Sequence, residues 1–285
     1  MSQRRNSSSS RKLRARRRTL RGRERSFEAE LAGPLFAEII DGARGLQALE
    51  HPFEAEAWAS GLLGIWQSMP SVPGIIEPDQ VFGCGLVRHA QQEASDAALA
   101  LLLAVAAVAR APVGAAAQAA ARQLRASSAT PPVWGDAVGR STFLGGWLGV
   151  APGCPQEAVV AVFDYAGASC HAVVLLIDYL LGGVIKDAFI APDPDELLGR
   201  GQRLGDVSLE PVSGAVLAGR ISAALGAGQR HSAALGAMVD QNARDLAALL
   251  AARLRGLPRP QPGPKTPELL LTAGGRPLFV LDARS

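Results

Sequence analysis

Three strand-like stretches, separated by short glycine-containing loops, follow one another in the second half of the chain. They are AVVAVFDY (158–165), CHAVVLLID (170–178) and VIKDAFI (184–190). Valine, isoleucine and aromatic residues favour strands. Gly182 and Gly183 separate the last two stretches, and Gly-Gly suits a two-residue hairpin turn because both central residues need positive φ. The pattern predicts an antiparallel meander and limits the fold to classes that contain one.

The regions on either side of the meander have helical character. Alanine, leucine and arginine are abundant there and are good helix formers. The meander is apolar on both faces, so it needs a cover on each side. We therefore predict an α+β fold, with a helical N-terminal half packed on a small antiparallel β-meander and further C-terminal helices. The helical half is expected to cover the second face of the sheet.

Composition changes along the chain predict four segments. Residues 1–26 are expected to be a disordered basic tail and residues 27–128 a helical domain. Residues 129–257 are expected to form an α+β domain that contains the meander. Residues 258–285 are expected to form a proline-rich linker and a C-terminal hairpin. Whether that hairpin joins the main sheet is left open by the sequence.

The basic tail carries most of the positive charge. Residues 1–26 hold eleven Arg or Lys and one acid, so their net charge is +10; the whole chain is +3, and the remainder therefore sums to −7. The run Arg14, Arg16, Arg17 and Arg18 is a candidate for contacts with nucleic-acid phosphates. No aromatic residue interleaves these arginines to stack on bases. The alternatives are a solvated tail, or a tail appended by an upstream start codon.

Loop lengths in the meander predict which charged residues face one another. A four-residue loop at 166–169 would place Asp164 opposite His171, and a two-residue Gly-Gly turn would place Asp178 opposite Asp187. His171 and Asp178 are seven residues apart, so they would lie on opposite faces and roughly 23 Å from each other. A single centre formed by all four residues is therefore not expected.

The four residues are the candidate catalytic groups, and the two hairpin acids are also the candidate metal ligands. Asp178 and Asp187 would have to share a proton, bind a divalent cation such as Mg²⁺, or be neutralised by a basic residue. Lys186 would point to the other face. The alternative is a longer turn that Asp178 caps with its carboxylate. For Asp164 and His171 the alternative is a hydrogen-bonded strand end. No other cofactor is predicted.

Other features point away from several classes of protein. The sequence contains no P-loop, dinucleotide-binding, CxxC, HExxH or GxSxG motif. The longest apolar run, residues 97–109, would give about 20 Å of helix, shorter than a hydrocarbon core of ~30 Å. We expect it to be a buried helix and expect no membrane partner. The three cysteines are few and unpatterned, which suits a reducing cytoplasm.

The hairpin also carries a sequence resemblance. The segment from Ile177 to Phe189 reads ID…LGG..KD.F and resembles a group of uncharacterised actinobacterial proteins with a similar hairpin. The likeness covers residues 155–200. In that group His and Asn often follow the first Asp, where this chain has Tyr179 and Leu180. The resemblance implies a shared fold and supplies no activity.

Three hypotheses about function remain. The sequence favours a non-enzymatic cytosolic interaction or regulatory protein with an unknown protein partner, without deciding firmly against an enzyme. The first alternative is a metal-dependent hydrolase-type enzyme that uses Asp178 and Asp187. The second alternative is a nucleic-acid-associated protein that binds through residues 1–26.

Overall fold

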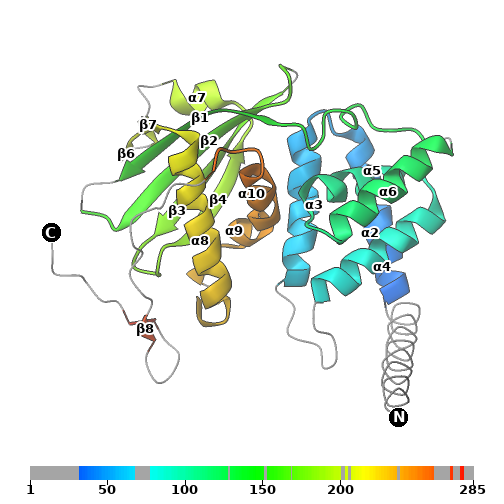
Figure 1. Cartoon of the computed structure of the whole chain (residues 1–285), viewed down its shortest axis with the longest axis horizontal. Helices are drawn as coiled ribbons and strands as arrows, with labels where there is room; N and C mark the ends of the chain where they lie inside the picture. Colours follow the sequence, from blue (N-terminus) through cyan, green and yellow to red (C-terminus); the bar gives the residue numbers. More distant parts are fainter. Residues whose placement is uncertain are drawn as a thin grey trace, which may run out of the picture.

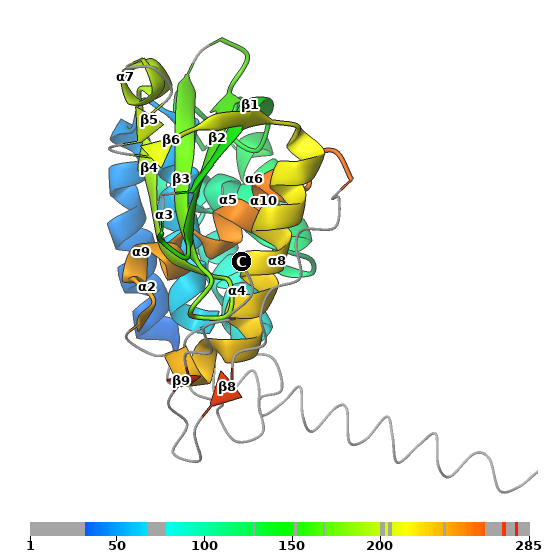
Figure 2. The same ribbon diagram turned by 90° about the vertical axis from the view of Figure 1, so that its left-hand side faces the viewer.

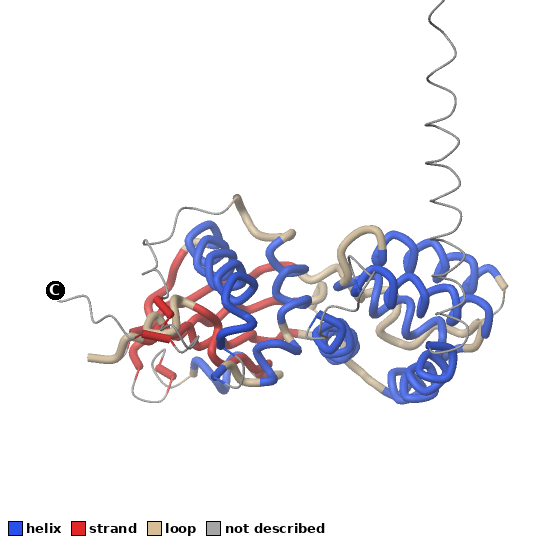
Figure 3. Tube along the Cα trace, turned by 90° about the horizontal axis from the view of Figure 1, so that it is seen from below, coloured by secondary structure: helices blue, strands red, loops and turns tan. Residues whose placement is uncertain are grey.

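The structure is a computed structural model with two groups of elements side by side (Figure 1). It describes residues 32–67, 78–127, 129–150, 153–167, 169–199, 203–204, 207–235, 238–259, 270–271 and 277–278. We refer to residues 32–127 as the helical half and to residues 129–259 as the sheet half. Among the described residues, strands lie in the sheet half and in the short C-terminal segments at 270–271 and 277–278 (Figure 3). The predicted α+β class is confirmed.

The helical half is built around one apolar helix. Its elements are α2 (Gly33–Gly42), the 3₁₀ helix η2 (Ala43–Ala48), α3 (Pro52–Gln67), α4 (Pro78–Glu93), α5 (Asp96–Val108) and α6 (Val113–Ala126). Helix α5 corresponds to the apolar run, and most of its residues are buried, as the sequence predicted. Ser95 caps α5 by accepting the backbone N–H of Ala98 at 3.1 Å. Within the described residues, no helix combines the length with the apolar character that crossing a bilayer requires.

The sheet has five antiparallel strands in the order β4-β3-β2-β1-β7. Their bounds are β1 (Thr142–Val150), β2 (Gln156–Asp164), β3 (Cys170–Asp178), β4 (Val184–Ala191) and β7 (Glu210–Val212). The predicted meander corresponds to β2, β3 and β4, so its strand order is confirmed. Two short strands at the C-terminus, β8 (Leu270–Leu271) and β9 (Pro277–Leu278), pair with each other and form a separate sheet.

The turns of the meander are longer than the sequence suggested. Asp178 pairs with Val184, so the β3–β4 turn has five residues and the predicted two-residue Gly-Gly turn is wrong. Both glycines do have positive φ, 79° at Gly182 and 75° at Gly183. They close a wider turn, in which the Gly183 N–H donates to the Asp178 carbonyl at 2.9 Å. The two glycines therefore have the positive φ that the sequence predicts, but the turn begins at residue 179, three residues before the predicted start.

The two faces of the sheet have different covers (Figure 2). Helices α8 (Gly214–Leu235), α9 (Gln241–Asp245) and α10 (Ala247–Leu254) lie on one face of the sheet. The strand side chains on this face belong to the core cluster that also contains the buried residues of the helical half. A second cluster lies on the other face and includes residues of the short elements α7 (Pro194–Leu198), β5 (Arg203–Leu204) and β6 (Val207–Ser208). The expectation that the helical half covers the second face is therefore wrong. It packs through α3 against α9 and α10, on the face those helices already cover.

Candidate functional site

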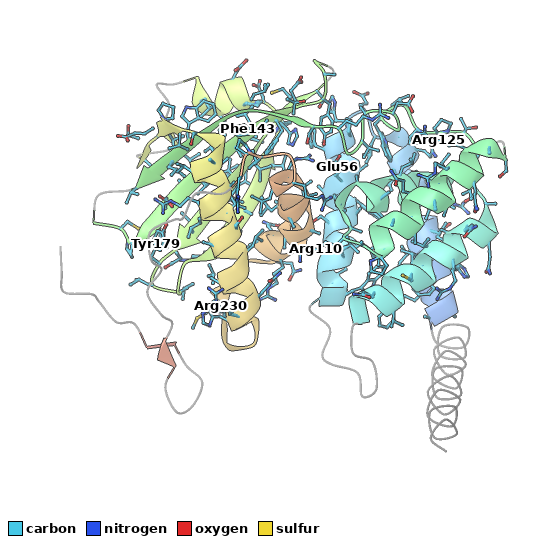
Figure 4. The ribbon with its side chains drawn as sticks, viewed as in Figure 1. Glu56, Arg110, Arg125, Phe143, Tyr179 and Arg230 are labelled. Atoms are coloured by element: carbon cyan, nitrogen blue, oxygen red, sulfur yellow. The ribbon has the colours of Figure 1, made fainter. Side chains whose placement is uncertain are left out.

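Four buried polar side chains meet where the two halves join. Glu56 comes from α3, Tyr165 and His171 from the β2–β3 hairpin, and Arg253 from α10; each is at most 5% exposed. We call these four residues the joint network. Figure 4 shows Glu56 near the boundary between the halves. The helical half thus supplies the acid, and the sheet half supplies the groups that pair with it.

Short contacts connect the members of the joint network. Arg253 Nη2 lies 2.6 Å from Glu56 Oε2 and also donates to the Tyr165 hydroxyl at 2.6 Å. That hydroxyl donates to Glu56 Oε2 at 2.8 Å. The second carboxylate oxygen of Glu56 accepts the backbone N–H of Gly139 at 2.7 Å. A buried carboxylate needs this number of donors, because an unpaired charge in the core is strongly unfavourable.

His171 occupies the apolar side of the joint network. Burial, together with the nearby Arg253 charge, lowers the pKa of His171 to about 3, so its imidazole is neutral at pH 7. The ring stacks on Phe53 at a centroid distance of 4.8 Å, and Nε2 lies 3.4 Å from Arg253 Nη2. Burial also raises the pKa of the Tyr165 hydroxyl, with a further contribution from the Glu56 charge, which keeps that hydroxyl a donor. A neutral imidazole and a protonated phenol of this kind suit a structural joint.

The predicted pairing of Asp164 with His171 is wrong. Asp164 pairs with Cys170 and His171 with Phe163, because the loop has five residues and closes through the Tyr165 N–H to the Ser169 carbonyl at 3.0 Å. The carboxylate of Asp164 instead accepts the N–H of Gly167 at 2.6 Å, within its own loop. Asp164 is therefore a loop-capping residue at the end of β2.

Asp178 is engaged on both of its carboxylate oxygens. Oδ1 accepts the N–H groups of Leu180 at 2.9 Å and Leu181 at 3.3 Å, and so caps the turn. Oδ2 accepts the Gln156 side chain at 2.7 Å and lies 3.4 Å from Lys186 Nζ. The longer capped turn, the alternative raised from the sequence, is the arrangement that the structure shows.

Asp187 lies opposite Leu176, so the expected face-to-face pairing of Asp178 and Asp187 is wrong. A register shift between Leu176 and Ile177 leaves Lys186 as an extra residue on β4. The expectation that Lys186 points away from Asp178 is wrong for the same reason. Asp187 Oδ1 accepts the N–H of the next residue, Ala188, at 2.7 Å.

The other predicted site residues add no further cluster. Arg14, Arg16, Arg17 and Arg18 lie outside the described residues. Within the described part of the chain, no group of three or more His, Cys, Asp or Glu side chains is arranged to hold a metal ion. The three cysteines lie on α4, before β2 and on β3.

Another buried acid, on β2, lies near the β3–β4 turn. Glu157 of β2 accepts the Tyr179 hydroxyl at 2.7 Å and lies 3.3 Å from Arg220 Nε of α8. Burial, with the hydrogen bond and charge of Glu157, raises the pKa of Tyr179 to about 12. Glu157, Tyr179 and Arg220 thus connect α8 to the sheet, and the joint network connects α3 to α10 in a similar way.

A hollow of about 440 Å³ lies between α5, α6, the loop that precedes β1 and the C-terminal end of α10. Its lining residues are Leu103, Ala106, Ala107, Gln118, Ala121, Arg122, Arg125, Gly135, Asp136, Val138, Gly139, Arg140 and Arg255. Four of these residues are arginines and one, Asp136, carries a carboxylate, so the lining has an excess of positive charge. We call this feature the arginine hollow.

The four arginines differ in how they are held. Arg125 donates to the Asp136 carboxylate and to the Gly135 carbonyl, both at 2.9 Å. Arg255 donates to the Ala107 carbonyl at 2.9 Å. The guanidinium groups of Arg122 and Arg140 form no ion pair or hydrogen bond with the residues that the structure describes. Two arginines are therefore fixed on the walls, and two are available to a ligand.

Nearby charges reinforce the positive character of the arginine hollow. Burial lowers the pKa of Arg255, and the positive charges of Arg110 and Arg253 lower it further, whereas Glu56 acts in the opposite direction. Like charges gathered in this way favour the binding of an anion. The hollow also touches the joint network, since Gly139 lines it and donates to Glu56.

Sequence reasoning missed both the joint network and the arginine hollow. Their members come from segments up to about two hundred residues apart, which only the folded chain brings together. One signal was present: the arginines between residues 110 and 140 stand out in a body whose remaining charge is net negative.

Comparison with protein-family models, with curated proteins and with solved structures found no match.

Proposed function

We propose that this chain is a non-enzymatic cytosolic interaction or regulatory protein that binds an anionic partner in the arginine hollow. The observation that carries this proposal is the set of four guanidinium groups around one concave surface, with one carboxylate among them. Charged clefts of one sign raise the local concentration of ligands of the opposite sign. The net negative charge of residues 27–285 makes the hollow a local exception on an acidic body. The small number of cysteines, three in 285 residues, supports the cytosolic part of the proposal.

The hydrolase alternative has less support from the geometry. Asp178 is occupied by backbone, Gln156 and Lys186 contacts, and Asp187 lies at a different register position. A metal-dependent site would need both carboxylates to converge on one point. Calorimetric titration with Mg²⁺ of the wild type and of Asp187→Ala checks this, and an Asp187-dependent heat of binding would revive the alternative.

The proposal is tested by measuring anion binding to the full chain by isothermal titration calorimetry. Suitable probes are inorganic phosphate, citrate and a hexaglutamate peptide. We expect at least one of them to bind, and expect that binding to be lost in the double variant Arg122→Gln/Arg140→Gln. Arg230→Gln is the matched control, because Arg230 is an exposed arginine of α8 in the sheet half (Figure 4). If no anion binds in a manner that depends on Arg122 and Arg140, the proposal is refuted.

A further inference from the structure

We propose that the ligand of the arginine hollow is a small molecule that carries a phosphate monoester on an apolar body. This inference rests on the proposed function, because it names the class of anion that the hollow binds. It combines three properties of the lining: two unpaired guanidinium groups, two guanidinium groups fixed by the backbone, and an apolar wall.

The unpaired groups are suited to a phosphate. Arg122 lies on α6 and Arg140 lies just before β1, and both side chains are exposed. A guanidinium presents planar donors in a rigid fork, which matches the oxygens of a phosphate in a bidentate contact. Two such groups supply two positive charges, the number that a phosphate monoester dianion requires.

The fixed groups prepare the hollow before a ligand arrives. Arg125 and Arg255 are each tied to a backbone carbonyl of the wall, of Gly135 and Ala107 respectively. Side chains that are already ordered lose less conformational entropy on binding. Asp136 offsets one of the four charges, so the lining has a net charge of +3 and remains positive after a dianion binds.

The apolar wall is suited to the rest of the ligand. Leu103, Ala106 and Ala107 of α5, with Ala121 of α6 and Val138, contribute hydrocarbon surface to the same hollow. The volume of about 440 Å³ falls within the range of roughly 300–1,000 Å³ that is usual for small-molecule sites. An extended polymer would instead need a groove or a stripe of charge. The shape therefore favours a small molecule over nucleic acid.

The test is calorimetric titration of the full chain with phenyl phosphate, benzoate, inorganic phosphate and hexaglutamate at one low ionic strength. Phenyl phosphate is expected to bind most tightly, because it alone combines a dianion with an apolar ring. Its affinity should rise between pH 5 and pH 7, since the second proton of a phosphate monoester dissociates near about pH 6.

Variants of the lining arginines locate the binding site. Arg122→Gln and Arg140→Gln should each weaken phenyl phosphate binding at least about tenfold, as expected for the loss of a charged hydrogen bond. Arg122→Lys and Arg140→Lys should weaken it less, because they keep the charge but lose the fork. Arg230→Gln should leave the affinity unchanged. Circular dichroism spectra confirm that each variant is folded.

The possible failures can be distinguished. If no probe binds in a manner that depends on Arg122 and Arg140, both the proposed function and this inference fall. If benzoate or hexaglutamate binds as tightly as phenyl phosphate at these arginines, the proposed function stands and the phosphate assignment is overturned. If inorganic phosphate binds as tightly as phenyl phosphate, the apolar body is overturned. Binding that persists in the double variant would place the phosphate contacts elsewhere, for example in residues 1–26, and would overturn both.

Discussion

At the scale of single residues, the joint network shows how a buried charge fixes the packing of two halves. Glu56 is fully buried, and it is satisfied only when Arg253, Tyr165 and Gly139 reach it together. These partners belong to α10, the β2–β3 loop and the segment before β1. The position of α3 is therefore set by polar contacts as well as by the apolar core.

Arg253→Ala should destabilise the protein by roughly 3–5 kcal/mol, because it leaves the Glu56 carboxylate buried without its counter-charge. The double variant Glu56→Leu/Arg253→Met should lose less, since neither charge remains in the core. Urea denaturation followed by circular dichroism measures both free energies of unfolding. If the double variant loses as much stability as Arg253→Ala or more, the cost of Arg253→Ala does not come from an unpaired Glu56 charge.

His171 should make the free energy of unfolding depend on pH. Its pKa is about 3 in the folded protein and about 6.5 when unfolded, so between these values the unfolded chain binds the extra proton. The stability that the neutral ring contributes is fully present above about pH 6.5 and is lost as the pH falls toward 3. Over this range the free energy of unfolding should fall by up to about 1.4 kcal/mol for each pH unit.

His171→Phe should keep the stacking on Phe53 and remove this part of the pH dependence. Thermal or urea unfolding of the wild type and the variant at pH 7, 6 and 5 provides the comparison. The difference between the two curves isolates the histidine from the carboxylates that titrate in the same range. Parallel curves would show that His171 is not the group responsible.

At the scale of elements, β4 is an edge strand on which two backbone groups have partners outside the sheet ladder. Asp187 accepts the N–H of Ala188 at 2.7 Å, and the N–H of Asp240 donates to the Lys186 carbonyl at 2.8 Å. Occupied or charged edges resist pairing with a second sheet. Phe189, on the same strand, is 43% exposed, so an unprotected edge would also present an apolar side chain.

Asp187→Ala should therefore increase self-association with little loss of stability. Light scattering and size-exclusion chromatography across a concentration series measure the association. Asp195→Ala is the matched control, because Asp195 is an exposed acid on α7. If both variants remain at the size of the wild type, Asp187 does not protect the edge.

The order of the strands could be predicted from the sequence, but their register could not. Val- and aromatic-rich stretches with short loops predict a meander, because few other arrangements bury them. The turn at Gly182 and Gly183 was placed by its glycines, yet its length depends on the Asp178 cap, whose partners include Gln156 and Lys186 from neighbouring strands. Because the predicted register was wrong in both hairpins, the predicted pairings of Asp164 with His171 and of Asp178 with Asp187 were wrong as well.

At the scale of the whole molecule, one core continues through both halves. A single cluster of buried apolar residues includes Leu99 and Leu102 of α5 as well as Leu175 of β3 and Leu217 of α8. With the joint network at the same boundary, both apolar and polar contacts hold the two halves together. Neither the arginine hollow nor the joint network could be predicted, because both exist only once this boundary has formed.

We expect the helical and sheet halves to unfold in a single cooperative transition. Far-ultraviolet circular dichroism follows the helices of both halves. Tryptophan fluorescence of Trp147→Phe follows the helical half and its boundary, because Trp58 and Trp66 lie on α3 and Trp134 donates to the Leu46 carbonyl of η2. The two midpoints, both measured on Trp147→Phe, should coincide. Separate transitions would show that the halves fold independently.

The hydrogen bond from Gly139 to Glu56 places the outer wall of a surface recess one contact away from the central charge of the interior. A selection for altered ligand affinity would therefore return substitutions deep inside the protein, at positions that never meet the ligand, alongside those on the recess itself.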